Sequence, residues 1–350
     1  MGFNTDKQTL DELNLLGKFR HDSVYYLFNR VKTRGGEQLL DDMFRCPLTA
    51  AGAINERSSI FRYFQQAALS FPFDEKQVAL MREFLDTRGS KSAILVLAGT
   101  FLKKWLSGLI RDERYKKSVQ GLQATIITLT QCHRFIESIG NGHGAYGPRL
   151  TAMRRLLADK RLEHLRNIDI YKRLPVRTLA YYDHLLKGRL HKEMEAVLAF
   201  VYEVDVNIAV SDIARKKGFG YAQAAAAEED VLLAKDLYHP CIDNAVGNHI
   251  SLHKNSNVLF LTGANMAGKS TLMKSVGIGL YLAHMGFPIA ASHMEFSVKE
   301  GLYSSINVAD NIGLGYSHFY AELVRVKQAA EAAASGKRLL FMFDKLFKGP

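Results

Sequence analysis

The chain has 350 residues, of which 47% are hydrophobic and 23% are charged. This length suits two domains of ordinary size, and the composition excludes a chain that is disordered or of low complexity throughout. The formal net charge is +11, and residues 101–200 carry nearly all of the excess, with 19 Lys and Arg against 9 Asp and Glu. Such a basic stretch attracts a phosphate backbone, but it is equally compatible with the solvated outside of a helical bundle.

The N-terminus does not have the pattern of a signal peptide. Residues 1–16 are polar and acidic, with no cationic head followed by an apolar run. The longest apolar stretches fall short of the ~20 residues that a membrane span needs. Three well-separated cysteines, Cys46, Cys132 and Cys241, suit a reducing compartment. We therefore expect a cytoplasmic protein with no membrane partner.

The first part of the chain has helical periodicity. From Thr9 to Glu203 apolar residues recur at intervals of three and four, which predicts amphipathic helices. The glycine-rich stretch 140–148 predicts a loop between two of them. Around Gly218 the pattern changes to short apolar runs. The sequence therefore predicts a helical domain over residues 1–217 and a second domain over residues 218–350.

The second domain contains short apolar runs that indicate buried strands. These runs are Val231–Ala234, Val258–Leu261 and Leu339–Phe343. Between the last two lie two stretches with helical character, Ser270–Met285 and His318–Ala334. The order strand, helix, helix, strand predicts an α/β nucleotide-binding core.

A glycine-rich loop follows the second of these predicted strands. It has the spacing Gly-x-x-x-x-Gly-Lys-Ser, known as Walker A, and its last residue opens an apolar helix. Its glycines let successive N–H groups point at phosphate oxygens, and the helix N-terminus adds its positive end. Lys269 is expected to reach the β- and γ-phosphates, and Ser270 to ligate Mg²⁺. The predicted ligand is ATP with Mg²⁺, bound by Gly263, Ala264, Asn265, Met266, Ala267, Gly268, Lys269 and Ser270.

A second element of such sites is an apolar strand that ends in an aspartate. The run Leu339–Phe343 followed by Asp344 fits this pattern and predicts a second Mg²⁺ ligand. In many ATPases of this architecture a glutamate comes next and orients the attacking water, but here the next residue is Lys345. A cation cannot accept the proton of that water. We therefore expect ATP binding with turnover near background.

Several separated motifs resemble those of the MutS family of DNA mismatch repair ATPases. Thr262–Thr271 resembles the family's form of Walker A, with Asn-Met in its middle. Tyr238-His239-Pro240 resembles the His-Pro that opens the family's ATPase domain. The segment 310–323, containing Gly-Tyr-Ser-His-Phe, resembles the family's signature, with His318 where Thr is usual. The chain resembles short members without the mismatch-reading domain, and we expect it to be truncated after the strand that ends in Asp344, known as Walker B.

The resemblance implies a fold and a set of site residues. The fold is an α-helical core and lever domain followed by an α/β P-loop NTPase domain like that of ABC ATPases, incomplete at its C-terminal end. The implied catalytic residues are Asp344, Asn265 and Ser317, of which Ser317 acts in trans on the nucleotide of a second subunit. Thr271 adds to the nucleotide-binding residues, and His239 is a candidate for contact with the adenine. An ordinary helix N-cap at Ser317 and a strand-end turn at His239 remain alternative interpretations.

Two functions of different classes compete. The first is an ATP-gated protein that binds double-stranded DNA through the basic residues of 101–200, related to mismatch repair. The second is a nucleotide-binding pseudo-ATPase or scaffold without DNA binding, which Lys345 favours. The family implies a homodimer, which we expect to be weak here because the family's dimerising segment would follow Pro350.

Overall fold

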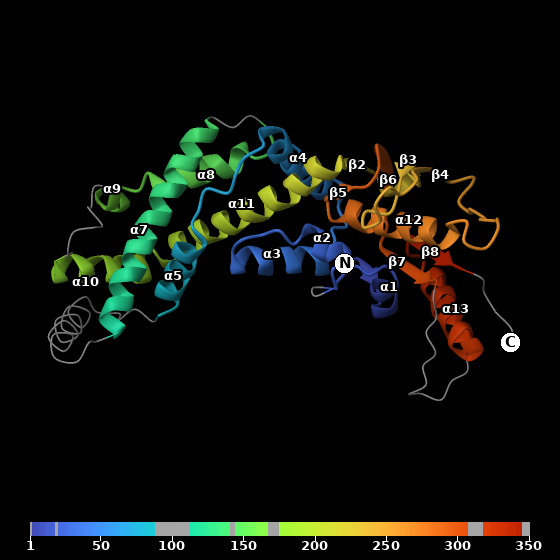
Figure 1. Cartoon of the computed structure of the whole chain (residues 1–350), viewed down its shortest axis with the longest axis horizontal. Helices are drawn as coiled ribbons and strands as arrows, with labels where there is room; N and C mark the ends of the chain where they lie inside the picture. The colour runs from blue at the N-terminus through green and yellow to red at the C-terminus, as the bar shows by residue number, and fades with distance from the viewer. Residues whose placement is uncertain are drawn as a thin grey trace. The chain divides into compact units, whose positions relative to one another are not determined.

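The computed structural model describes residues 2–17, 20–87, 113–140, 144–166, 175–306 and 318–344. These residues form a mixture of helices and sheets (Figure 1). Helices dominate as far as Lys217, and apart from the short β1 the described strands come after that residue.

The described residues form helices and strands with the following bounds. The helices are α1 (Lys7–Glu12), α2 (Val24–Phe28), α3 (Arg34–Arg45), α4 (Ala51–Ala67), α5 (Glu75–Asp86), α7 (Glu113–Ile139), α8 (Gly147–Leu157), α9 (Lys160–Arg166), α10 (Val176–His184), α11 (His191–Lys217), α12 (Lys269–His284) and α13 (His318–Ala334). The strands are β1 (Asn4–Thr5), β2 (Gly220–Ala225), β3 (Leu232–Leu237), β4 (Asn248–Leu252), β5 (Pro288–Ile289), β6 (His293–Ser297), β7 (Gly301–Ser305) and β8 (Leu339–Phe343). A π-helical turn, Leu185–Arg189, follows α10, and a 3-10 turn, Ala227–Glu229, follows β2.

The chain divides into two compact units, each built from separate stretches of sequence. One, here called the sheet unit, comprises Met1–Arg30, Leu40–Leu69 and Asn207–Pro350. The other, here called the helical unit, comprises Val31–Leu39 and Ser70–Val206. The domain boundary predicted near Gly218 falls between α11 and β2 and stays a prediction.

The sheet unit contains two sheets. The first has the order β1-β7-β8 with all strands parallel, and it pairs Asn4 with Gly301 and Ser305 with Phe343. The second has the order β4-β3-β6-β2-β5, in which β2 and β6 are parallel and the other pairs antiparallel. Two of the strand predictions are confirmed, as β3 and β8, and the helices predicted at Ser270–Met285 and His318–Ala334 are α12 and α13.

Helix α12 runs through the core of this unit. It contacts β2, β3 and β5 of one sheet and β7 of the other (Figure 1). From Ser275 to His284 every residue is buried, as expected for a helix that is apolar on all sides. Gly277 allows the closest approach, since a Cβ there would lie 2.5 Å from the side chain of Met342 on β8. The backbone of α12 therefore packs directly against a side chain of β8 at this point.

Aromatic rings surround the end of α12. Phe287 packs edge-on against Phe28, Phe44 and Phe61, with ring centroids 5.4, 5.5 and 5.0 Å away. Edge-to-face packing of this kind stabilises by about 0.5–1.5 kcal/mol per pair beyond area burial. The cluster joins residues from α2, α3 and α4 to the chain after α12.

The strand predicted at Val258–Leu261 does not form. These residues belong to neither sheet, and Val258 and Phe260 are 81% and 85% exposed. A strand is stable only when a neighbour accepts and donates its ladder hydrogen bonds. Within the described residues no strand pairs with this segment, so its high β-propensity is not realised.

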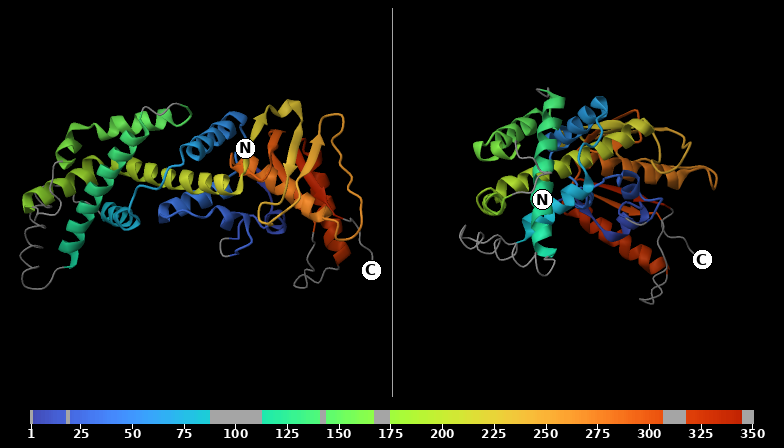
Figure 2. Two further views of the ribbon diagram at one scale, coloured as in Figure 1. Left: turned by 45° about the horizontal axis from the view of Figure 1, so that its top comes forward. Right: turned by 60° about the vertical axis from the view of Figure 1, so that its left-hand side comes forward.

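In the helical unit, α5 and α7 lie side by side (Figure 2). A buried carboxylate organises the start of α3: Asp205 accepts hydrogen bonds from the N–H of Lys32 and from the N–H and hydroxyl of Thr33. Burial raises the pKa of Asp205, although these hydrogen bonds act in the opposite direction.

The longest described helices, α7 and α11, have 27 residues each. Charged side chains recur along α11, and in α7 they lie near its two ends. Within the described ranges, no helix combines the length and the apolar character that crossing a membrane requires.

His284, the last residue of α12, is fully buried and bridges two backbone groups. Its Nδ1 lies 2.8 Å from the carbonyl oxygen of Leu48, and its Nε2 accepts the N–H of Lys299 at 3.2 Å. A carbonyl can only accept, so Nδ1 carries the proton and the ring is neutral. Burial lowers the pKa of His284 to about 4, and the charge of Lys299 acts in the same direction.

This burial makes the stability of the sheet unit dependent on pH. The unfolded chain takes up a proton on His284 near pH 6.5, while the folded chain resists protonation to about pH 4. The free energy of unfolding should therefore fall by roughly 3 kcal/mol as the pH drops from 6.5 to 4. Urea unfolding at several pH values measures this. His284→Gln should be less stable at pH 7.5 but show a shallower pH dependence; an equal slope in both proteins would contradict the prediction.

Candidate nucleotide-binding site

The loop before α12 has the backbone of an anion cradle. Gly263 and Gly268 have φ values of 143° and 89°, and Met266 has a φ of 65°. These positive values turn the chain so that it enters α12 at Lys269, with Gly268 as the N-cap and no acidic residue in the first turn. A helix N-terminus leaves backbone N–H groups without internal partners, and they attract an anion. The loop residues 262–268 are exposed and so accessible to a ligand.

Lys269 folds back over this loop. Its Nζ donates to the carbonyl oxygens of Gly263 and Ala264 at 2.7 and 2.6 Å. The ammonium group is therefore held at the centre of the loop by two weak acceptors. A phosphate oxygen carries a full negative charge and would form stronger, charge-assisted hydrogen bonds with the same group.

Ser270 and Asp344 meet, although 74 residues separate them. The Ser270 hydroxyl donates to Oδ2 of Asp344 at 2.6 Å. Asp344 follows directly on β8, and its own N–H donates to the carbonyl oxygen of Ser305 on β7 at 2.9 Å. The sequence predicted these two side chains as Mg²⁺ ligands, and the fold brings them together.

The donor set fits Mg²⁺. A hydroxyl and a carboxylate are the hard oxygen ligands that this ion prefers, and it keeps its remaining positions for phosphate oxygens and water. Both side chains are half-buried, and among the described residues no Lys or Arg forms an ion pair with Asp344. Its negative charge is therefore available to a cation. Bound Mg²⁺ would neutralise charge on the nucleotide phosphates.

His239 lies on the turn after β3 and is half-buried. Burial lowers its pKa, and the charge of Lys274 on α12 acts in the same direction, so the ring is neutral at pH 7. Its Nδ1 accepts the N–H of Cys241 at 3.3 Å, as the strand-end turn interpretation expects. Among the described residues, His239 forms no hydrogen bond with the loop. Its contact with the adenine stays a prediction.

Other predicted residues divide into two groups. Asn265 and Met266 in the loop and Thr271 in the first turn of α12 are exposed, so a nucleotide can reach them. Ser317 and Lys345 lie outside the described residues, as does most of the signature segment, and α13 begins directly after Ser317. The sequence patterns did not single out Arg325 on α13. A cation among apolar residues of a helix can nevertheless indicate a buried, paired charge.

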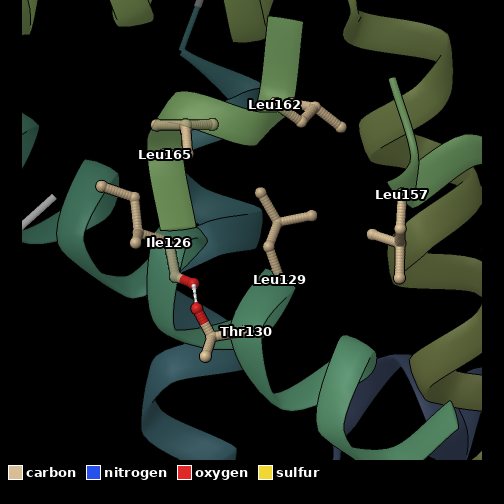
Figure 3. A pocket seen from close by; sticks show the side chains of 6 residues that line it. All are labelled: Ile126, Leu129, Thr130, Leu157, Leu162 and Leu165. Carbon is tan, nitrogen blue, oxygen red and sulfur yellow. Dashed lines mark hydrogen bonds between the residues drawn. The ribbon is translucent and has the colours of Figure 1, made fainter. Parts of the chain in front are cut away.

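A small pocket elsewhere lacks the polar groups that a nucleotide needs. It lies in the helical unit between α7, α8 and α9 (Figure 3). Its lining residues are Ile126, Leu129, Thr130, Leu157, Leu162 and Leu165. The one polar side chain among them, Thr130, donates to the carbonyl oxygen of Ile126 at 2.9 Å. The walls are thus apolar, and phosphate binding there is excluded.

Comparison with known proteins identifies the segment that carries the loop, α12 and Asp344. Residues 259–350 match the MutS domain V family. The DNA mismatch repair protein MutS of Streptococcus uberis is 26% identical over 187 residues, which are 52% of this chain and 20% of that protein. MutS of Streptococcus pyogenes serotype M5 is 27% identical over 135 residues, 37% of this chain and 16% of that protein.

The candidate site therefore lies in a segment similar to MutS domain V, in which a glycine-rich loop precedes a buried helix. The chain is similar to MutS proteins over about half of its length, and residues 259–350 match the MutS domain V family. It covers about a fifth of the length of the first of these relatives.

The contact between Ser270 and Asp344 predicts the effect of removing the hydroxyl. Ser270→Ala should lose most of the gain in ATP affinity that Mg²⁺ provides, about tenfold or more, because one metal ligand is gone. Isothermal titration with ATP, in Mg²⁺ and in EDTA, measures this gain. Ser275→Ala is the matched control, since that hydroxyl donates to the carbonyl oxygen of Thr271 within α12. Equal behaviour of the two variants would rule out Ser270 as a ligand.

Proposed function

We propose that this protein binds ATP with Mg²⁺ in the loop 263–270 and that nucleotide occupancy controls its binding to double-stranded DNA. The observation that carries the proposal is the 2.6 Å hydrogen bond between Ser270 and Asp344. It joins the loop to the end of β8 at the position where the sequence pattern requires a metal. The names of the matched relatives, DNA mismatch repair proteins, support a role in DNA maintenance.

The chemistry of the site follows from its groups. The N–H groups of the loop and of the first turn of α12 would hold the phosphates, and Lys269 would exchange its two carbonyl partners for phosphate oxygens. Ser270 and Asp344 would both coordinate Mg²⁺, in place of the hydrogen bond between them. We also propose that Asn265 orients water at the γ-phosphate and that Ser317 of a second copy approaches the same phosphate.

Cationic side chains of the helical unit supply a surface for DNA. Lys116 and Arg134 on α7, Arg155 on α8 and Lys160 at the start of α9 are all exposed. In the described part of the chain none of these four forms an ion pair with an acidic residue. Their charge is therefore not neutralised locally, and phosphates can compete for it.

Removing the loop lysine tests nucleotide binding. Lys269→Ala should weaken ATP binding about 10- to 100-fold, because a charged group loses its hydrogen bonds to phosphate. The helical content should remain unchanged in circular dichroism, since the ammonium contacts only the loop. Lys327→Ala, an exposed lysine on α13 that pairs with Glu331, serves as the control. If the Lys269 variant bound ATP as tightly as wild type, the loop would not be the nucleotide-binding site.

A salt series tests DNA binding and separates the two candidate functions. The logarithm of the affinity for duplex DNA should fall linearly with the logarithm of the salt concentration. In the double variant Lys116→Ala/Lys160→Ala the slope should become shallower by about 1 for each phosphate that is no longer neutralised. Fluorescence anisotropy with labelled duplex measures both. A scaffold without a DNA partner would show no binding even at low salt, which would overturn the DNA part of the proposal.

A further inference from the structure

Arg325 is a buried cation on α13 with an exposed fraction of only 4%. Its guanidinium forms an ion pair with both carboxylate oxygens of Asp6, through Nη1 and, at 3.0 Å, through Nη2. Its Nε and Nη2 donate to the carbonyl oxygen of Ser304 at 3.1 and 2.7 Å, and Nη2 also donates to the Thr9 hydroxyl at 2.9 Å. One side chain thus ties the N-terminal segment and β7 to α13.

Two residues of α1 bind the end of β7 directly. The N–H of Ser304 donates to the Thr9 hydroxyl at 2.9 Å. Oε2 of Glu12 accepts two hydrogen bonds, from the Ser304 hydroxyl at 2.5 Å and from the N–H of Ile306 at 3.0 Å. The Glu12 carboxylate therefore holds the strand on both sides of Ser305.

Ser305 is the residue that positions the predicted metal ligand. It pairs with Phe343 in the parallel ladder, and its carbonyl oxygen accepts the N–H of Asp344 at 2.9 Å. Asp344 in turn accepts the hydroxyl of Ser270. Glu12 is thus connected to Ser270 by hydrogen bonds and by the backbone that joins Ser304, Ser305 and Ile306.

We propose that Glu12 is a positioning residue of the nucleotide site, which fixes the end of β7 and through it the carboxylate of Asp344. The inference rests on the proposed binding of ATP with Mg²⁺. Asp6, Thr9 and Arg325 hold α1 in the place from which Glu12 acts. Burial of Asp6 opposes ionisation, but its hydrogen bonds from Arg325 and Thr9 outweigh that effect and lower its pKa, so this clamp keeps its charge at neutral pH.

The physical reason lies in how Mg²⁺ selects its ligands. This ion demands near-ideal octahedral geometry, so a small displacement of one carboxylate costs affinity. Groups that orient a ligand from behind typically change metal affinity 10- to 100-fold when they are removed. Glu12 acts one step further back, because it binds Ser304 and Ile306, the two neighbours of the residue that accepts the N–H of Asp344.

The test compares ATP affinity in Mg²⁺ and in EDTA for the full chain. Glu12→Ala should lower the Mg²⁺-dependent gain about tenfold and leave the affinity in EDTA within about twofold of wild type. Glu12→Gln should retain most of the gain, because its amide oxygen can accept both hydrogen bonds. Hydrogen exchange of the peptide that contains residues 339–344 should be faster in Glu12→Ala only.

A second variant keeps the test valid if Glu12→Ala fails to fold. Ser304→Ala removes one of the two donors to Glu12 and should give a smaller loss, about twofold to threefold, with the same dependence on Mg²⁺. Glu331→Ala is the matched control, an exposed carboxylate on α13, and should behave as wild type.

The outcomes separate the inference from the proposed function. If wild type binds ATP and Glu12→Ala or Ser304→Ala loses affinity equally in Mg²⁺ and in EDTA, or loses none, the positioning role is wrong and the proposed function stands. If wild type binds no ATP, the proposed function is overturned and the role of Glu12 with it.

Discussion

The arrangement of the site depends on how closely α12 packs against β8. At Gly277 the tip of the Met342 side chain rests against the backbone of the helix, and a Cβ there would lie only 2.5 Å from Met342 Cε. This close contact brings the first turn of α12 level with the end of β8, where the Ser270 hydroxyl reaches Asp344. A helix held further away by side chains would separate the two residues beyond hydrogen-bonding distance.

Burying polar side chains costs free energy unless they form hydrogen bonds, and His284 and Arg325 both form them. His284 at the buried end of α12 uses both ring nitrogens on backbone groups, and Arg325 finds acceptors for its guanidinium on Asp6, Thr9 and Ser304. An unpaired charge or donor in such surroundings would cost several kcal/mol. Removing one partner is therefore far more damaging than removing a comparable contact at the surface.

These polar groups also connect parts of the sheet unit that are distant in the sequence. The N-terminal residues Asn4 and Thr5 add a strand to the sheet that carries Asp344, and α1 contacts β7. The first residues of the chain are thus structural components of the candidate nucleotide site.

The sequence by itself determined those features that local patterns encode. The spacing of glycines with Lys269 and Ser270, the apolar helix after them and the apolar run that ends at Asp344 each need only neighbouring residues, and the structure has them as the loop, α12 and β8. Helical periodicity likewise predicted α13 over His318–Ala334. These features can be predicted from the sequence because φ and ψ preferences and amphipathic periods depend on only a few neighbouring residues.

Only the tertiary structure decided which residues meet. Val258–Leu261 has the composition of a strand but finds no ladder partner among the described residues and stays exposed, because strand formation requires a neighbour that local sequence cannot supply. Glu12 and Arg325 gave no sign of their contacts with Ser304, since pairing across hundreds of residues depends on the packing of the whole unit. For the same reason the pattern of residues could name Ser270 and Asp344 as ligands, but only the fold placed them 2.6 Å apart.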